Sequence, residues 1–361
     1  MKAIHQFTAG FGPGDAISNQ AAAMQDIFRR WGFDSTVFSE SKRISPVLKN
    51  RAAPLSDYMK HADESNIVIL HLSIGSPVNE AFRTLKCKKA ILYHNITPPR
   101  YFEMINSATA RVLKLGREQM KALADSAEIN MAVSKYNSAE LEKAGYSNVS
   151  VVPLILDLNR LRTGSLSPYH GMHSRKKTIL FVGRCAPNKK IEDLLDAFCF
   201  FHRFVEPESR LLHVGSFAGT EKYYALLADR AKRLGIENAV DFAGVLSQQE
   251  LNACYDGADA FLCMSEHEGF CIPLFEAMAH DLPVIAYSAG AIPETLDGSG
   301  ILFRRKQYNI LAEMIGRVVG DQDFRRAVIV GQQKRLKRHT SIDIADELKN
   351  RLAPLMESNR Q

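Results

Sequence analysis

The sequence predicts an α/β protein with two doubly wound domains, and three observations support this prediction. Short apolar segments typical of buried strands recur along the chain, and helical segments follow them. The length of 361 residues is enough for two domains that each bury a core. A polar stretch over residues 163–177, with three serines, two glycines and a proline, indicates the boundary between them.

The composition is that of an ordinary globular protein. Apolar residues make up 46% of the chain and charged residues 24%. No apolar run approaches the length of a membrane span, and the first residues, MKAIHQFTAGFG, lack a signal-peptide core. The six cysteines form no C-x-x-C pair and lie mostly in apolar segments, so we expect reduced core thiols in a cytoplasmic protein.

Positive charge is unevenly distributed. The net charge is +6, and residues 83–121 hold nine lysines and arginines against two acids. This region favours an anionic partner, such as a phospholipid surface or a lipid pyrophosphate. A solvated helix face explains the charge equally well. Nucleic acid is the weakest candidate, because no helix-turn-helix, zinc finger or RNP-like motif accompanies the charge.

The first domain begins with a strand over residues 2–7 and a glycine-rich loop, TAGFGPGDA, before a helix over about 17–31. Glycines let the backbone approach a ligand at such a turn, although the spacing is not that of the dinucleotide fingerprint. The predicted strands that follow cover residues 35–39, 67–72, 90–93, 129–133 and 149–154, and helices are expected over about 106–127 and 134–145.

Two histidines stand at the ends of predicted strands. His94 follows the strand over residues 90–93 and precedes a stiff loop with two prolines. A doubly wound domain places functional groups at this edge, although a single histidine more often has a structural role. His71 is the second candidate.

The second domain begins with a strand over residues 178–182 and the turn GRCAPNKK, which leads to a helix from Ile191. Arg184 and Lys189 flank this turn and can converge on one anion. The turn lacks the glycines of a Walker motif, and two exposed cations that cap a loop are the alternative interpretation. Later strands are predicted over 211–215, 240–244, 260–264 and 283–287.

An acid pair marks the most informative stretch of the chain. Glu268 lies in a polar loop after the strand over 260–264, and Glu276 lies in the following helix, which has Pro273 in its first turn. Both carboxylates can face a ligand at the N-terminal end of that helix. The free amides around Gly269, Phe270 and Cys271, together with the helix dipole, favour phosphate there. Solvation or a complement to the dipole is the alternative for each acid.

The pattern S-x-x-E-G-F-x-x-P-x-x-E-A-M from Ser265 to Met278, followed by PVIA and IPE, resembles the E-x7-E signature of retaining glycosyltransferases of family 4, of the bacterial polysaccharide and lipopolysaccharide type. The turn after residue 182 is similar to the family's G-R-x-x-P-x-K, although the family often has glycine where Lys190 stands. The resemblance implies the GT-B fold, with two Rossmann-like domains facing a central cleft and a last helix that crosses back to the first domain. The implied division is an acceptor-binding domain over residues 1–160, a linker over 161–177, a nucleotide-sugar-binding domain over 178–340 and the returning helix over 341–361.

The resemblance also implies roles for individual residues. Arg184 and Lys189 hold the donor diphosphate, Glu268 orients the sugar hydroxyls, and His94 lies close to the sugar and the acceptor. Further donor contacts are implied at Glu276, Gly269, Phe270, Cys271, Gly215, Val245 and Leu246, and acceptor-side contacts at Gly14, Asp15 and Asn19.

The expected activity is retaining, metal-independent transfer of a hexose from GDP-mannose or a UDP-sugar to a hydroxyl of a glycan or lipid-linked oligosaccharide. Positive side chains take the place of a divalent ion. Asp321-x-Asp323 precedes a helix, where capping explains it better than metal binding. No cofactor is expected, and the protein is expected in the cytoplasm, with peripheral contact at the inner membrane face. A GT-B epimerase or hydrolase and a non-catalytic carbohydrate-binding protein are the alternatives.

Overall fold

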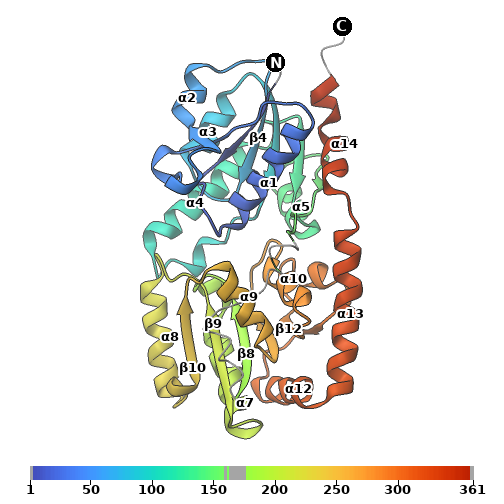
Figure 1. Ribbon diagram of the computed structural model, residues 1–361. Helices are drawn as coiled ribbons and strands as arrows, with labels where there is room; N and C mark the ends of the chain where they lie inside the picture. Colours follow the sequence, from blue (N-terminus) through green and yellow to red (C-terminus); the bar gives the residue numbers. More distant parts are fainter. Residues whose placement is uncertain (1–2, 158–160, 162–175, 358–361) are drawn as a thin grey trace. The chain divides into compact units, whose positions relative to one another are not determined.

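The computed structural model describes residues 3–157, 161 and 176–357. It divides into two compact α/β units (Figure 1). Unit 1 contains Met1–Arg100, Ala108–Ile155 and Asp343–Gln361, and unit 2 contains Tyr101–Ser107 and Leu156–Ile342. Most of the predicted linker, residues 162–175, lies outside the described residues.

Unit 1 is built on a seven-stranded parallel sheet with the order β3-β2-β1-β4-β5-β6-β7. The apolar strands at its centre are buried, as in other parallel sheets, where the helices that connect the strands cover both faces. The strands are β1 (Ile4–Thr8), β2 (Val37–Ser39), β3 (Ala52–Pro54), β4 (Ile67–Leu72), β5 (Lys88–Tyr93), β6 (Ile129–Ala132) and β7 (Ser150–Val151). The helices are α1 (Ala16–Arg30), α2 (Leu55–Lys60), α3 (Pro77–Thr84), α4 (Ser107–Ala122), α5 (Lys135–Lys143) and α14 (Ile344–Glu357).

Unit 2 is built on a six-stranded parallel sheet with the order β10-β9-β8-β11-β12-β13. Its strands are β8 (Lys177–Val182), β9 (Ser209–Val214), β10 (Val240–Gly244), β11 (Ala260–Cys263), β12 (Val284–Tyr287) and β13 (Ile301–Phe303). The helices are α7 (Ile191–Phe204), α8 (Glu221–Arg233), α9 (Gln248–Asp256), α10 (Ile272–Ala279), α11 (Ile292–Leu296), α12 (Tyr308–Gly320) and α13 (Gln322–Thr340).

Two segments belong to a different unit from the residues that precede them in the sequence. Residues Tyr101–Ser107 belong to unit 2, where Asn106 Nδ2 donates to the Gly219 carbonyl at 2.8 Å. The last helix, α14, belongs to unit 1, where Lys88 Nζ donates to the Leu355 carbonyl at 2.9 Å. Among the described residues, no helix has both the length and the apolar content that a membrane crossing requires.

Candidate active site

The strand order of unit 2 identifies the place where a ligand would bind. Strands β8 and β11 are neighbours, paired at Ala260 with Ile179, and the sheet grows outward from them in opposite directions. The loops that follow these two strands therefore diverge above the carboxyl edge of the sheet, which is where doubly wound sheets bind ligands. One loop carries Arg184 and Lys189, and the other carries Glu268.

Lys189 and Glu268 meet at this edge. Lys189 ends a short 3₁₀ turn (Pro187–Lys189), and its Nζ donates to both carboxylate oxygens of Glu268 at 2.7 Å. Burial lowers the pKa of Lys189, but the charge of Glu268 and the hydrogen bonds to it outweigh burial and raise that pKa above its ordinary value. The site therefore contains a largely buried ion pair in which Lys189 carries a full positive charge.

The backbone of the Glu268 loop is held from two sides. Asn188 Nδ2 donates to the His267 carbonyl at 3.1 Å, and the Glu266 amide donates to the Asn188 carbonyl at 2.9 Å. From the other side, the Ala291 amide donates to the Glu268 carbonyl at 3.0 Å. These contacts fix the main chain on which the Glu268 carboxylate stands.

Gly290 makes the last of these contacts possible. Its φ is +57°, and a Cβ atom there would lie 2.6 Å from the Glu268 carbonyl oxygen and 2.9 Å from its nitrogen. Sequence reasoning did not include Gly290 or Asn188 in the site. The glycine in the turn between β12 and the I-P-E sequence could have indicated a role for Gly290. No sequence pattern pointed to Asn188.

Arg184 and Lys189 have different hydrogen-bond partners: Lys189 contacts Glu268, whereas Arg184 contacts the loop after β9. The Arg184 guanidinium is on an exposed residue and donates to the Ala218 carbonyl, in the loop after β9, at 2.7 Å. A Cβ atom on Gly215 would lie 1.9 Å from the Gly183 carbonyl oxygen, so glycine is required where the loops after β8 and β9 touch. Convergence of the two cations on one anion stays a prediction.

Lys190 has the backbone conformation that favours glycine, with φ of +53°. Its ammonium lies 3.3 Å from Glu192 and 3.8 Å from Glu266. The position is therefore compatible with lysine, and acidic neighbours compensate its charge.

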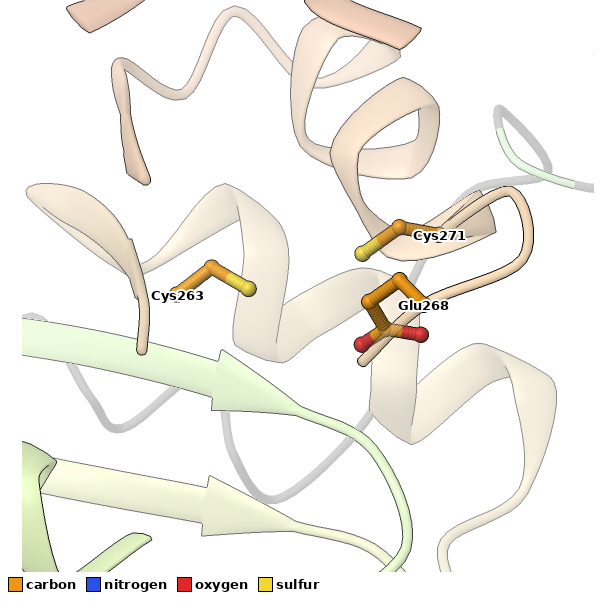
Figure 2. Close-up of side chains that lie close together, drawn as sticks. All are labelled: Cys263, Glu268 and Cys271. Carbon is orange, nitrogen blue, oxygen red and sulfur yellow. The ribbon is translucent and has the colours of Figure 1, made fainter. Parts of the chain in front are cut away.

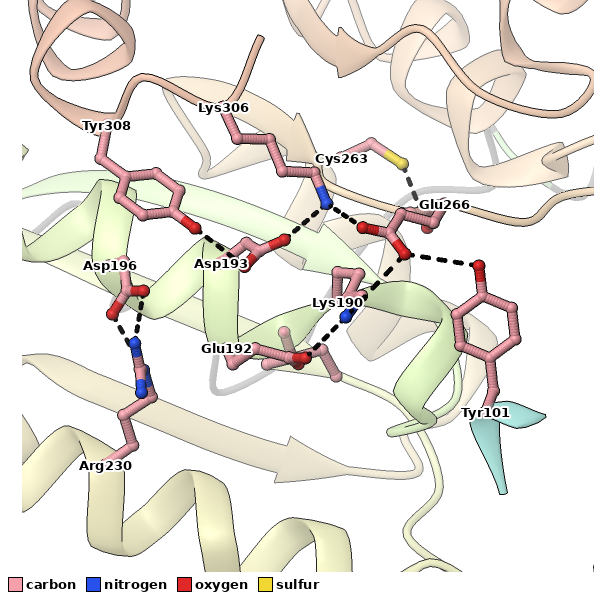
Figure 3. A network of polar contacts seen from close by, with 12 residues as sticks. Tyr101, Lys190, Glu192, Asp193, Asp196, Arg230, Cys263, Glu266, Lys306 and Tyr308 are labelled. Atoms are coloured by element: carbon pink, nitrogen blue, oxygen red, sulfur yellow. Dashed lines mark hydrogen bonds and ion pairs between the residues drawn. The ribbon is translucent and has the colours of Figure 1, made fainter. Parts of the chain in front are cut away.

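The Glu266 carboxylate belongs to a larger polar network that also includes Tyr101, Asp193, Lys306 and Tyr308 (Figure 3). Lys306 Nζ donates to Glu266 at 2.8 Å and also contacts Asp193, whose other oxygen accepts from the Tyr308 hydroxyl at 2.9 Å. The Tyr101 hydroxyl donates to Glu266 at 3.3 Å. Sequence reasoning missed this network because its members lie far apart along the chain.

Glu276 is positioned by a buried tyrosine. The Tyr255 hydroxyl, in α9, donates to a carboxylate oxygen of Glu276 at 2.7 Å. Burial, followed by the charge of Glu276, raises the pKa of Tyr255, so the phenol stays protonated and remains a donor. Tyr255 thus orients one of the two predicted acids.

The remaining predicted donor contacts surround the start of α10 and the loop after β10. Cys271 is the N-cap of α10 with φ of +66°, and the Phe270 ring stacks on Phe275 at 5.6 Å, which leaves its backbone as the group available to a ligand. Val245 is 77% exposed, unusual for an apolar side chain, and Leu246 is half-buried.

His94, in unit 1, belongs to a chain of hydrogen bonds. Its Nε2 lies 2.9 Å from His71 Nδ1, and His71 Nε2 lies 2.9 Å from Gln6 Oε1. Gln6 Nε2 donates to the Ala21 carbonyl at 2.9 Å, and a carbonyl can only accept, so the amide oxygen of Gln6 must face His71.

This chain fixes the tautomers of both histidines. His71 must donate from Nε2 to Gln6, so its Nδ1 is an acceptor and His94 must donate from Nε2. Burial lowers the pKa of His71 to about 3, and burial together with His71 lowers the pKa of His94, so both rings are neutral near pH 7. Nδ1 of His94 is consequently an unprotonated acceptor.

The predicted acceptor-side residues lie at the start of α1. Asp15 is the N-cap of that helix and accepts from the Ser18 amide at 2.8 Å and from its hydroxyl at 2.7 Å. Gly14 has φ of +76°, and Gly14, Asp15 and Asn19 are exposed. Asp15 therefore has a structural role whether or not it contacts an acceptor. At the other end of the chain, Asp321 caps α13 by accepting from the Phe324 amide at 2.9 Å, as predicted.

Part of unit 2 is similar in sequence to known glycosyltransferases. Residues 167–341 match the family model described as "Glycosyl transferases group 1". The D-inositol 3-phosphate glycosyltransferase of Nocardia farcinica is 30% identical over 218 residues, which cover 58% of this chain and 48% of that protein. The mannosylfructose-phosphate synthase of Agrobacterium fabrum is 35% identical over 120 residues, covering 32% of this chain and 26% of that protein. The chain spans about half the length of the curated relatives it matches.

Solved structures resemble the chain over nearly its full length. Anabaena HepE, solved with UDP and glucose, has a TM-score of 0.75 at 18% identity, covering 98% of this chain and 100% of that one. The sucrose-phosphate synthase of Thermosynechococcus elongatus has a TM-score of 0.74 at 16% identity, covering 98% and 99%. These likenesses confirm the predicted two-domain fold. The chain therefore has the two-domain GT-B fold, and its residues 167–341 are similar to the glycosyl transferases of group 1.

Proposed function

We propose that this chain is a glycosyltransferase that moves a hexose from a nucleoside-diphosphate sugar to a hydroxyl group of an acceptor. The observation that carries the proposal is the Lys189–Glu268 ion pair, at the ligand-binding edge of a group 1 domain. HepE, a structural neighbour, was solved with UDP and with UDP-glucose, which supports a UDP-sugar over GDP-mannose as the donor.

The ion pair suits a site that must hold both phosphate and sugar. The Lys189 ammonium has three donors, and two of them are directed to Glu268. The third can bind a donor phosphate while the carboxylate accepts from sugar hydroxyls. Lys189, Arg184 and the amides at the start of α10 would stabilise the negative charge that develops on the leaving diphosphate, worth about 3–4 kcal/mol for a well-placed donor in a dry site.

We propose that these fixed positive groups make a divalent ion unnecessary. Glu276, oriented by Tyr255, would hold the ribose hydroxyls, and Nδ1 of His94 would accept from a hydroxyl of the sugar or the acceptor. The proposed reaction is front-face attack by the acceptor hydroxyl with retention of anomeric configuration, since no carboxylate has been assigned as a covalent nucleophile.

The exposed positive charge of unit 1 favours an acceptor attached to an anionic lipid, such as a lipid-linked glycan. Several cations of the basic region are held internally, among them Arg117, whose guanidinium contacts Glu140 and the Ile96 carbonyl at 2.6 Å. Arg111, Lys114 and Lys121, on α4, remain exposed. These side chains could contact an anionic lipid or its pyrophosphate at the inner membrane face.

An assay with a panel of donors separates this proposal from its alternatives. The full chain is incubated with UDP-glucose, UDP-galactose or GDP-mannose, with and without a lipid-linked oligosaccharide. A transferase forms a new glycoside only when the acceptor is present, and analysis of the product's anomeric configuration tests retention. Conversion of the donor without acceptor would indicate an epimerase or hydrolase, and no conversion in either case would indicate a binding protein.

A further inference from the structure

Two buried thiols flank the Glu268 carboxylate. Cys263 is the last residue of β11, Cys271 is the N-cap of α10, and the loop that joins them carries Glu268 (Figure 2). The two sulfur atoms and a carboxylate oxygen all lie within 4.8 Å of one another. Of the residues that the structure describes, only these three form a His, Cys, Asp or Glu group this compact.

The three ligand atoms match the requirements of a thiophilic divalent cation. Zinc takes thiolate sulfur at about 2.3 Å and carboxylate oxygen at about 2.0–2.2 Å, and sites with three protein ligands keep a fourth position open. Ligand atoms at tetrahedral positions around zinc lie about 3.5–3.8 Å apart, so atoms already within 4.8 Å need to move by about 1 Å or less.

Lys189 balances the charge of such a site. Two thiolates and one carboxylate carry three negative charges, and a divalent cation with the Lys189 ammonium supplies three positive charges. Nζ lies 2.7 Å from each oxygen of Glu268, so it can keep a hydrogen bond to one oxygen while the ion takes the other. Cys263 is fully buried and Cys271 is 8% exposed, so little water competes for the ion.

We propose that Cys263, Glu268 and Cys271 bind one Zn²⁺ or Cd²⁺ ion, and that the bound ion inhibits sugar transfer. Binding converts two thiols to thiolates and releases two protons for each ion bound. The ion then holds the carboxylate that the donor sugar needs. The inhibition rests on the proposed function, whereas binding of the ion does not.

The test uses the full chain, reduced and freed of metal. Cd²⁺ is added while the sulfur-to-cadmium charge-transfer absorption is followed, and Zn²⁺ is added in a weakly buffered solution while proton release is measured. We expect one ion and two protons per chain. Cys263→Ser should bind Cd²⁺ at least tenfold more weakly. Cys199→Ser, a buried cysteine in α7, is the matched control and should bind Cd²⁺ like the unmodified protein.

Glu268→Gln is a second variant for the case that Cys263→Ser unfolds. It keeps the shape of the side chain and removes the carboxylate charge. This variant should also bind Zn²⁺ at least tenfold more weakly than the unmodified protein. Absence of the cadmium–thiolate band in the unmodified protein, or equal binding by Cys263→Ser, overturns the proposal. In the transfer assay, Zn²⁺ should lower the initial rate and a chelator should restore it. If the chain transfers no sugar, the proposed function fails while the cadmium titration still decides the metal site.

Discussion

At the residue scale, the Lys189–Glu268 pair explains how a charged site stays folded before a donor arrives. The Lys189 and Glu268 side chains are 21% and 9% exposed, so each charge would be costly without the other. The ion pair holds both side chains in place.

The first prediction concerns this mutual dependence. Lys189→Met leaves the Glu268 charge without its partner and should lower the free energy of unfolding by about 3 kcal/mol, the lower end of the range for breaking a buried pair. Glu268→Gln in the same chain should recover much of the loss. Urea unfolding of both single variants and the double variant gives the coupling energy, and a value near zero would show that the pair contributes nothing to stability.

The second prediction concerns pH. The folded-state pKa of His71 is about 3, below the ordinary 6.5, so the unfolded chain binds more protons between these values. The stabilising effect of a neutral His71 is complete above about pH 6.5 and is lost as the pH falls toward 3. Unfolding free energies measured from pH 7 to 4.5 should therefore fall less steeply for His71→Asn than for the unmodified protein. Parallel curves would contradict the assignment.

The third prediction concerns the tautomers along the Gln6–His71–His94 chain. Nitrogen-15 NMR of the imidazole rings should show both histidines protonated at Nε2 near pH 7. A proton on Nδ1 of His94 would mean that this atom is a donor, and the proposed acceptance of a substrate hydroxyl would have to be abandoned. The sequence placed His94 at a strand end but could not show this chain, because Gln6 lies 65 residues from His71.

At the scale of elements, the loops after β8, β11 and β12 are fixed to one another by close backbone contacts. The fourth prediction tests the contact at Gly290. Alanine there must accept φ of +57° and also displace the Glu268 backbone, whereas Gly298, with φ of +78°, has nothing within 4 Å of the new Cβ.

Gly290→Ala should therefore lose more stability than Gly298→Ala, for which the cost is that of the left-handed backbone alone, about 1–2 kcal/mol. Thermal unfolding gives the stability difference, and donor titration shows whether the displaced Glu268 backbone weakens binding. Equal losses in both variants would mean that the Gly290 contact does not position Glu268.

The sequence was most informative for long apolar elements and least informative for short ones. β4 coincides with the predicted strand over residues 67–72, because its apolar side chains are buried on both faces of the sheet. β3 and β13, each three residues long, were not predicted. Segments this short carry too few residues for a periodic pattern, and tertiary pairing decides their conformation.

At the scale of the whole molecule, the fold class and the position of the acid pair could be predicted, but the contacts among loops could not. The E-x7-E motif is contiguous, so its spacing survives in the sequence. Lys306 and Tyr101 reach Glu266 from 40 and 165 residues away, and only the folded chain brings them to it.

The proposal assigns donor binding to unit 2 and acceptor binding to unit 1, so the donor should stabilise the protein without any acceptor. A donor at 100 times its dissociation constant adds about 2.7 kcal/mol to the free energy of unfolding if it binds only the native state. Among the donors tested, one nucleoside diphosphate should therefore raise the melting temperature more than the others.

The most direct test of the account is the kcat/KM for transfer from the preferred donor in Lys189→Ala, Arg184→Ala and Glu276→Ala, with Lys232→Ala, an exposed lysine in α8, as the control. We expect each of the first three variants to lose at least tenfold, about 1.4 kcal/mol of transition-state stabilisation, and the control to keep full activity. Full activity in Lys189→Ala or Glu276→Ala would contradict a donor site at the carboxyl edge of the unit 2 sheet.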